Sequence, residues 1–206
     1  MTAKNDLEKL IENLRHRRLY DLLSSPFYLV KIIDYYNEHK TLPESKKDVF
    51  EYLIQKRIEK DLDKYQNTGI NIEVYSSKIN DVLEKIAMIM QHMGQNHLES
   101  DKVFGRLITE EKLNKIIKHT FLFNKTNRDE SWQFEHNNFK EYLAARYLSK
   151  LSNRQIKKIT SVNKSLKKIK PNWLNTVSLL FSLLPEGNKL DKLSRWIFKR
   201  LSRADS

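Results

Sequence analysis

The stretch 132–148 contains two hydrophobic periods, one directly after the other. Trp132 and Phe134 alternate with polar neighbours, which is typical of a half-buried strand. Beyond His136 the apolar residues follow a helical period instead, and they are Phe139, Tyr142, Leu143 and Tyr147. The sequence therefore predicts a strand that runs directly into a helix, with His136 at the joint.

The start of this helix is predicted at Asn137 or Asn138, because asparagine is a favoured N-cap residue. His136 continues the alternation of the strand, so its side chain should begin on the inner side of the module. The chain then turns into the helix, where the imidazole can point outward. We expect His136 to be partly exposed if it contacts a ligand, and enclosed if it is a structural residue.

The motif Phe-x-His-x-x-Phe-x-Glu-Tyr-x-Ala-Ala, from Phe134 to Ala145, closely resembles the signature of the winged-helix domain in NACHT-type STAND NTPases. These proteins are multidomain, ATP-dependent signalling switches of immunity and bacterial defence. The resemblance implies that His136 donates a hydrogen bond to a phosphate of ADP and holds the winged helix closed. The alternative interpretation is a strand and helix of the hydrophobic core with an incidental histidine.

A second match lies near the N-terminus. Ser25 and Pro26 predict a helix start, since serine caps helices and proline suits the first helical position, and the helix should end near His39 and Lys40. The segment from Leu22 to Pro43 is similar to the first helical domain of the same family. There the resemblance implies that Pro26 packs near the adenine of the nucleotide; alternatively, Pro26 only starts a helix.

The fold class is predicted to be mainly α, because the chain has only 4 Gly and 4 Pro and few alternating patterns. Residues 1–62 would form a helical domain that follows a nucleotide-binding core, 72–149 the winged-helix domain, and 150–206 the start of a C-terminal helical region. The polar stretch from Asp61 to Asn71 is the predicted boundary. A helix over 109–119, a hairpin over 121–134 and the following helix give the layout of a winged-helix module, with the hairpin as the wing.

Several local signals accompany this division. The run His16-Arg17-Arg18 is predicted to be the solvated end of a first helix, and Ser45 with Asp48 to form a capping box. Gly94 is a predicted C-cap of the helix before it. That helix carries the clearest apolar stripe of the chain, formed by Ile79, Val82, Leu83, Ile86 and Met90.

The formal net charge of +12 suggests an acidic partner or a nucleic acid. The candidate nucleic-acid contacts are the wing residues Lys125 and Arg128 and the basic residues Lys157, Lys158, Lys167 and Lys168. Binding should be weak and non-specific, because the predicted recognition helix offers only lysines beside glutamates. The basic stretch can also be the solvated faces of short helices. A free-standing winged-helix nucleic-acid binder and a helical adaptor, acting through the surface around Trp173 and Trp196, are the alternative functions.

No phosphate-binding loop is present, since none of the four glycines opens such a motif. The chain alone is therefore predicted not to be an enzyme, and to meet ATP or ADP only together with a nucleotide-binding core of the same or a companion chain. Oligomerisation of the parent protein is a further expectation. We expect no metal, because His92 and His97 are isolated, and no membrane segment, because no apolar run is long enough. A cytoplasmic location is predicted.

Overall fold

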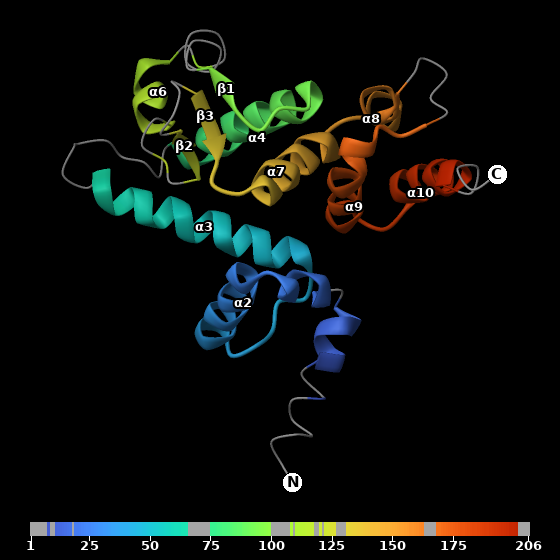
Figure 1. Cartoon of the computed structure of the whole chain (residues 1–206), viewed down its shortest axis with the longest axis horizontal. Helices are drawn as coiled ribbons and strands as arrows, with labels where there is room; N and C mark the ends of the chain where they lie inside the picture. Colours follow the sequence, from blue (N-terminus) through green and yellow to red (C-terminus); the bar gives the residue numbers. More distant parts are fainter. Residues whose placement is uncertain are drawn as a thin grey trace. The chain divides into compact units, whose positions relative to one another are not determined.

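A computed structural model describes residues 8, 11–17, 19–65, 75–99, 108, 110–117, 120, 122–126, 131–162 and 168–201. The described part is mainly helical, as predicted, and carries one small three-stranded antiparallel sheet (Figure 1). The chain forms two compact units, Met1–Lys56 and Arg57–Ser206. The predicted boundary near residue 150 falls inside the second unit, and residues 66–71 of the predicted boundary at 61–71 lie outside the described residues.

The first unit contains the short 3-10 helix η1 (Tyr20–Ser24), helix α2 (Pro26–His39) and the first half of helix α3 (Lys46–Tyr65). Pro26 occupies the first position of α2, where its missing N–H is not needed, and Ser25 is the N-cap without a side-chain hydrogen bond. Lys40 ends α2 with a left-handed φ of 58°. The predicted start and end of this helix are therefore confirmed.

The hydrophobic core of this unit forms where α2 meets α3. Tyr28 of α2 packs edge-on against Phe50 of α3, with 5.7 Å between the ring centroids. Ile32 is also buried, one turn further along α2. The buried face of α3 within this unit comprises Val49, Phe50, Leu53 and Ile54.

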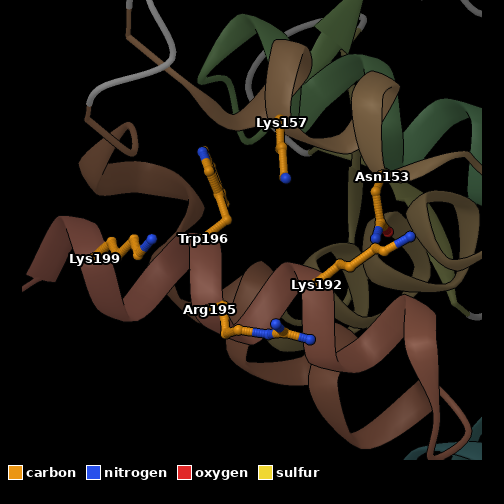
Figure 2. A pocket seen from close by; sticks show the side chains of 6 residues that line it. All are labelled: Asn153, Lys157, Lys192, Arg195, Trp196 and Lys199. Atoms are coloured by element: carbon orange, nitrogen blue, oxygen red, sulfur yellow. The ribbon is translucent and has the colours of Figure 1, made fainter.

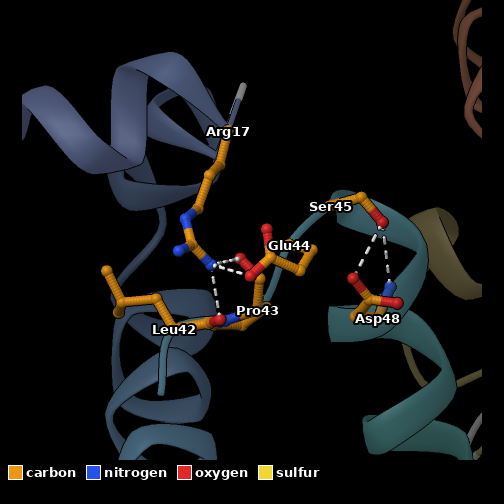
Figure 3. A network of polar contacts seen from close by, with 6 residues as sticks. All are labelled: Arg17, Leu42, Pro43, Glu44, Ser45 and Asp48. Carbon is orange, nitrogen blue, oxygen red and sulfur yellow. Dashed lines mark hydrogen bonds and ion pairs between the residues drawn. The ribbon is translucent and has the colours of Figure 1, made fainter.

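Arg17 is not the solvated helix end that the sequence suggests. Its Nη1 donates hydrogen bonds to the carbonyl oxygens of Leu42 at 2.7 Å and Pro43 at 3.2 Å, and contacts Glu44 Oε1 at 2.7 Å (Figure 3). A guanidinium can satisfy several acceptors at once, which a run of charged letters does not reveal. Arg17 therefore holds the loop between α2 and α3.

The predicted capping box at Ser45 is formed in part. Ser45 Oγ accepts a hydrogen bond from the backbone N–H of Asp48 at 3.4 Å and donates to the Asp48 carboxylate at 3.0 Å (Figure 3). In a complete box the carboxylate would instead reach the backbone N–H of the N-cap residue. The aspartate side chain is one methylene shorter than the usual glutamate and meets the hydroxyl.

A polar cluster joins the far end of α2 to α3. Tyr52 donates a hydrogen bond to Glu38 at 3.0 Å, and Lys56 contacts the other oxygen of the same carboxylate at 2.8 Å. Burial, and then the hydrogen bond to Glu38, raise the pKa of Tyr52 to about 12. The hydrogen bonds from Lys56 and Tyr52 lower the pKa of Glu38. At neutral pH the carboxylate of Glu38 is therefore ionised, and Tyr52 keeps the proton that it donates.

The second unit contains the sheet. It runs through helix α4 (Ser76–Met93), strand β1 (Leu98–Glu99), helix α6 (Glu111–Ile117), strands β2 (Phe123–Lys125) and β3 (Ser131–Phe134), and helix α7 (Asn137–Ser149). The predicted hairpin is confirmed, with Phe123 opposite Phe134 and Lys125 opposite Trp132. Strand β1 was not predicted; it pairs with β3 and places β3 in the centre of the sheet.

Helix α7 is the centre of this unit. It packs against α4 on one side and against α9 (Leu174–Leu183) on another (Figure 1). The predicted stripe of α4 is buried, and Gly94 ends that helix with a left-handed φ of 68°, as predicted. Because α7 is covered by both helices and by the sheet, its buried residues extend around the helix and are Phe139, Lys140, Tyr142, Leu143, Ala144, Ala145 and Leu148.

The remaining elements are helix α8 (Asn153–Thr160), the 3-10 turn η3 (Pro171–Trp173) and helix α10 (Asn188–Leu201). A complete capping box between Ser152 and Gln155 starts α8. Trp173 is fully buried and Trp196 is 7% exposed, so neither indole offers the surface that the helical-adaptor alternative requires. Among the residues that the structure describes, no helix combines the length and the apolar composition needed to cross a membrane.

Candidate functional site

The joint between β3 and α7 places His136. Helix α7 begins at Asn137, so the N-cap is His136 itself, with extended φ and ψ of −145° and 140°, and not Asn137 or Asn138 as predicted. The carbonyl oxygen of His136 accepts the N–H of Phe139 at 3.0 Å, and the imidazole makes no capping bond. The connection from strand to helix is short, because only Glu135 and His136 lie between the end of β3 and the start of α7.

The residues of the motif differ sharply in burial. Phe134 is 5% exposed, and Phe139 and Tyr142 are fully buried, as are both alanines at 144 and 145. His136 is half-buried. The exposure expected of a ligand-contacting histidine is thus present, whereas the apolar members of the motif form the hydrophobic core.

Carboxylates flank His136 on both sides along the chain. The carboxylate of Glu135 forms an ion pair with Arg57, and its backbone N–H donates to the carbonyl of Leu122 at 3.0 Å. Glu141 lies one turn into α7 and is half-buried. Both contacts of Glu135 fix the backbone that leads into His136.

Burial raises the pKa of Glu141. The charge of Lys140, a hydrogen bond from Asn175 of α9 and the charge of His136 act in the opposite direction. A positive charge on His136 thus favours the ionised form of the Glu141 carboxylate, but burial outweighs it.

Lys140 is a buried cation on the same helix. Its ammonium donates to Asn96 Oδ1 at 2.5 Å and to the carbonyl of Gln95 at 3.4 Å, and it makes no hydrogen bond to a carboxylate of the described residues. Burial lowers its pKa, and the nearby charge of Glu141 offsets only part of that effect. Sequence reasoning did not identify Lys140, because a lysine on a helix normally indicates a solvated face.

Pro26 lies in the first unit and is exposed at the start of α2. The helix that begins with Pro26 presents an exposed apolar face. The side chains of this face are 42–51% exposed and comprise Leu29, Val30, Ile33 and Tyr36. Since Pro26 and His136 belong to different units, each is placed only within its own unit.

The candidate nucleic-acid contacts do not form one site. Lys125 is exposed on β2, Lys158 on α8 and Lys168 in the segment before η3, while Arg128 and Lys167 lie outside the described residues. Lys115 of the predicted recognition helix α6 is bound to Glu111 at 2.9 Å, and Lys112 and Lys118 have no described side chains. The predicted wing and the predicted recognition helix therefore show no focused basic surface in their described residues.

Lys157 is the exception among these candidates. It is half-buried, and its ammonium lies 5.6 Å from the ring centroid of Trp196 on α10. Three further cations approach the same place, and they are Lys192, Arg195 and Lys199. Sequence reasoning missed them, although their spacing of three and four residues along one helix is a readable signal.

Within the described ranges, no three His, Asp or Glu side chains lie close enough together to hold a metal ion. Comparison of the sequence with models of known protein families, and of the chain with curated proteins and solved structures, finds no match.

Proposed function

We propose that this chain is the regulatory segment of a NACHT-type STAND signalling NTPase, with a helical domain and a winged-helix domain. It would close over ADP or ATP held by a nucleotide-binding core of the same or a companion chain, and couple the nucleotide state to conformational switching in bacterial defence or signalling. The observation that carries this proposal is the half-buried His136 at the joint between β3 and α7.

The fold accounts directly for the apolar residues of the motif. Phe134, Phe139 and Tyr142 fill the hydrophobic core, and the alanines allow close packing of α7. His136 is an N-cap whose side chain does not cap, so an ordinary capping residue would serve the helix better. Capping therefore does not require a histidine at this position.

The arrangement around the sheet supports the winged-helix part of the proposal. The order α4, β1, α6, β2, β3 gives two helices, a strand inserted between them and a hairpin, and the late strand β3 lies between β1 and β2. A hairpin that follows a helix and is anchored by a third strand is the arrangement that a wing requires. Residues 127–130, which form the tip of the predicted wing, lie outside the described residues.

The first unit supports a partner at α2. Pro26 is exposed, and the face that follows it carries Leu29, Val30, Ile33 and Tyr36. Contiguous exposed apolar side chains are typical of protein interaction sites. The proposed nucleotide-binding core would cover this face, with Pro26 against the adenine.

The proposed switch depends on one hydrogen bond from His136 to a phosphate of ADP. A hydrogen bond to a charged group contributes roughly 1.5–3 kcal/mol. This is enough to bias a two-state hinge but less than the ~5.5 kcal/mol needed to shift it almost completely. Exchange of ADP for ATP would break the contact and release the winged helix.

The test begins with the coding sequence upstream of Met1, where a phosphate-binding loop within about 300 residues is expected from the usual length of one or two domains. The protein that contains both parts, or the complex of the two chains, is then prepared with His136→Leu. We expect the affinity for ADP to fall about 10- to 100-fold, which corresponds to the loss of one charged hydrogen bond.

Asn138→Ala is the matched control, because it changes a half-buried polar residue of the same helix turn that the proposal does not use. It should leave ADP affinity unchanged. Unaltered ADP affinity in the His136→Leu protein would make His136 a structural residue, and the resemblance would then describe the fold only.

A further inference from the structure

We draw no further inference here: the strongest candidate, the groove between helices α8 and α10 that is lined by the solvent-facing cations Lys192, Arg195 and Lys199 (Figure 2), carries nothing beyond its charge, because nothing in the structure shows which anionic partner covers it.

Discussion

The carboxylate of Glu84 on α4 is buried, with 1% of its side chain exposed, and lies 2.7 Å from the ammonium of Lys150 at the end of α7. Arg146 Nε contacts its other oxygen at 3.2 Å. Lys150 also reaches Asp81, one turn earlier on α4, at 3.0 Å. These ion pairs fix the register of the two helices that pack most extensively in the second unit.

Glu84 is buried whereas its two partner cations are partly exposed, so removing the carboxylate and removing the cations should affect stability differently. The side chains of Arg146 and Lys150 are 26% and 54% exposed, so both can turn to water when the carboxylate is neutralised. Glu84→Gln should therefore cost only ~1 kcal/mol. Replacing Arg146 and Lys150 together by methionine leaves a buried carboxylate without a cation and should cost about 3–5 kcal/mol.

Chemical unfolding of the single, double and triple variants measures this coupling as a thermodynamic cycle. Adding Glu84→Gln to the double methionine variant should restore part of the lost free energy, because it removes the stranded charge. If Glu84→Gln lowers the free energy of unfolding as much as the double replacement does, the two cations do not turn freely to water, and the predicted asymmetry is wrong.

Removal of the charge of Lys140 should not destabilise the protein, unlike removal of the cations that pair with Glu84. Burial lowers the pKa of Lys140, so the folded state binds this proton less tightly than the unfolded chain does. Its charge therefore opposes folding at neutral pH, and this cost disappears as the pH rises through the lowered pKa to the unfolded value of about 10.4. Lys140→Met should leave the stability at pH 7 within about 1 kcal/mol of the wild type or raise it. Any gain should shrink as the pH rises toward ~10.4 and be absent above it.

Lys150→Met is the matched control on the same helix. Burial acts to lower the pKa of Lys150, but the hydrogen bonds to Glu84 and Asp81 outweigh it and raise the pKa. This lysine therefore favours folding below its unfolded pKa, and the control should lose stability at pH 7. Thermal unfolding at pH 7 and above pH ~10.4 distinguishes the two lysines. If both variants lose equal stability at pH 7, the hydrogen bonds to Asn96 and Gln95 compensate for the burial of Lys140.

Arg17 should be a major anchor of the first unit. Arg17→Met removes donors to two backbone carbonyls, which then lack a partner of equal strength, and should cost about 1.5–3 kcal/mol. Glu44→Gln should cost less than about 0.5 kcal/mol, because the Glu44 side chain is 78% exposed and its ion pair is screened by water. Far-UV circular dichroism during denaturant unfolding provides the measurement. If the two variants lose similar free energies of unfolding, the stabilisation by Arg17 comes from its ion pair with Glu44 and not from its hydrogen bonds to the loop backbone.

Hydrolysis of ATP by the purified chain should not exceed background, because the sequence contains no glycine-rich loop with a lysine to hold the phosphates. A coupled assay for released phosphate tests this expectation. Turnover above background that a point substitution within the chain abolishes would contradict it, since contamination by another ATPase would not respond to that substitution.

Local signals predicted much of the fold. The stripe of α4, its end at Gly94, the start of α2 at Pro26 and the hairpin β2–β3 all follow from period, capping and turn residues. Strand β1 escaped prediction because its two residues are a strand only through pairing, with Leu98 opposite Trp132. Such pairing depends on contacts between distant segments, which local periodicity does not contain.

The apolar residues of α2 show a different limit of sequence reasoning. They are spread around more of the helix than one neighbour can cover, so Tyr28 and Ile32 are buried while Leu29, Val30, Ile33 and Tyr36 remain exposed. Periodicity identifies an apolar helix but not which part of its surface the same chain covers. The exposed part is where the proposed nucleotide-binding core would pack.

The candidate sites were predictable to different degrees. His136 was identified because it stands where the strand period changes to a helical one and because the motif around it resembles a family signature, whereas its role as the N-cap of α7 depends on where the strand ends in three dimensions. The cluster of cations near Trp196 was only half visible in the sequence, since Lys157 lies on α8 and its three partner cations lie more than thirty residues later on α10. Packing of α8 against α10 brings them together.

The last prediction separates the two interpretations of His136 in this chain alone. His136→Leu should change the free energy of unfolding by less than about 1 kcal/mol, because the imidazole is half-buried and the capping contact at this position uses the backbone carbonyl. Phe139→Ala, at a fully buried position one turn away, should cost about 3–5 kcal/mol. Denaturant unfolding followed by tryptophan fluorescence reports on this unit, since Trp132, Trp173 and Trp196 all lie in it. A leucine variant as unstable as Phe139→Ala would make His136 a residue of the hydrophobic core, and the proposed contact with a nucleotide phosphate would lose its structural basis.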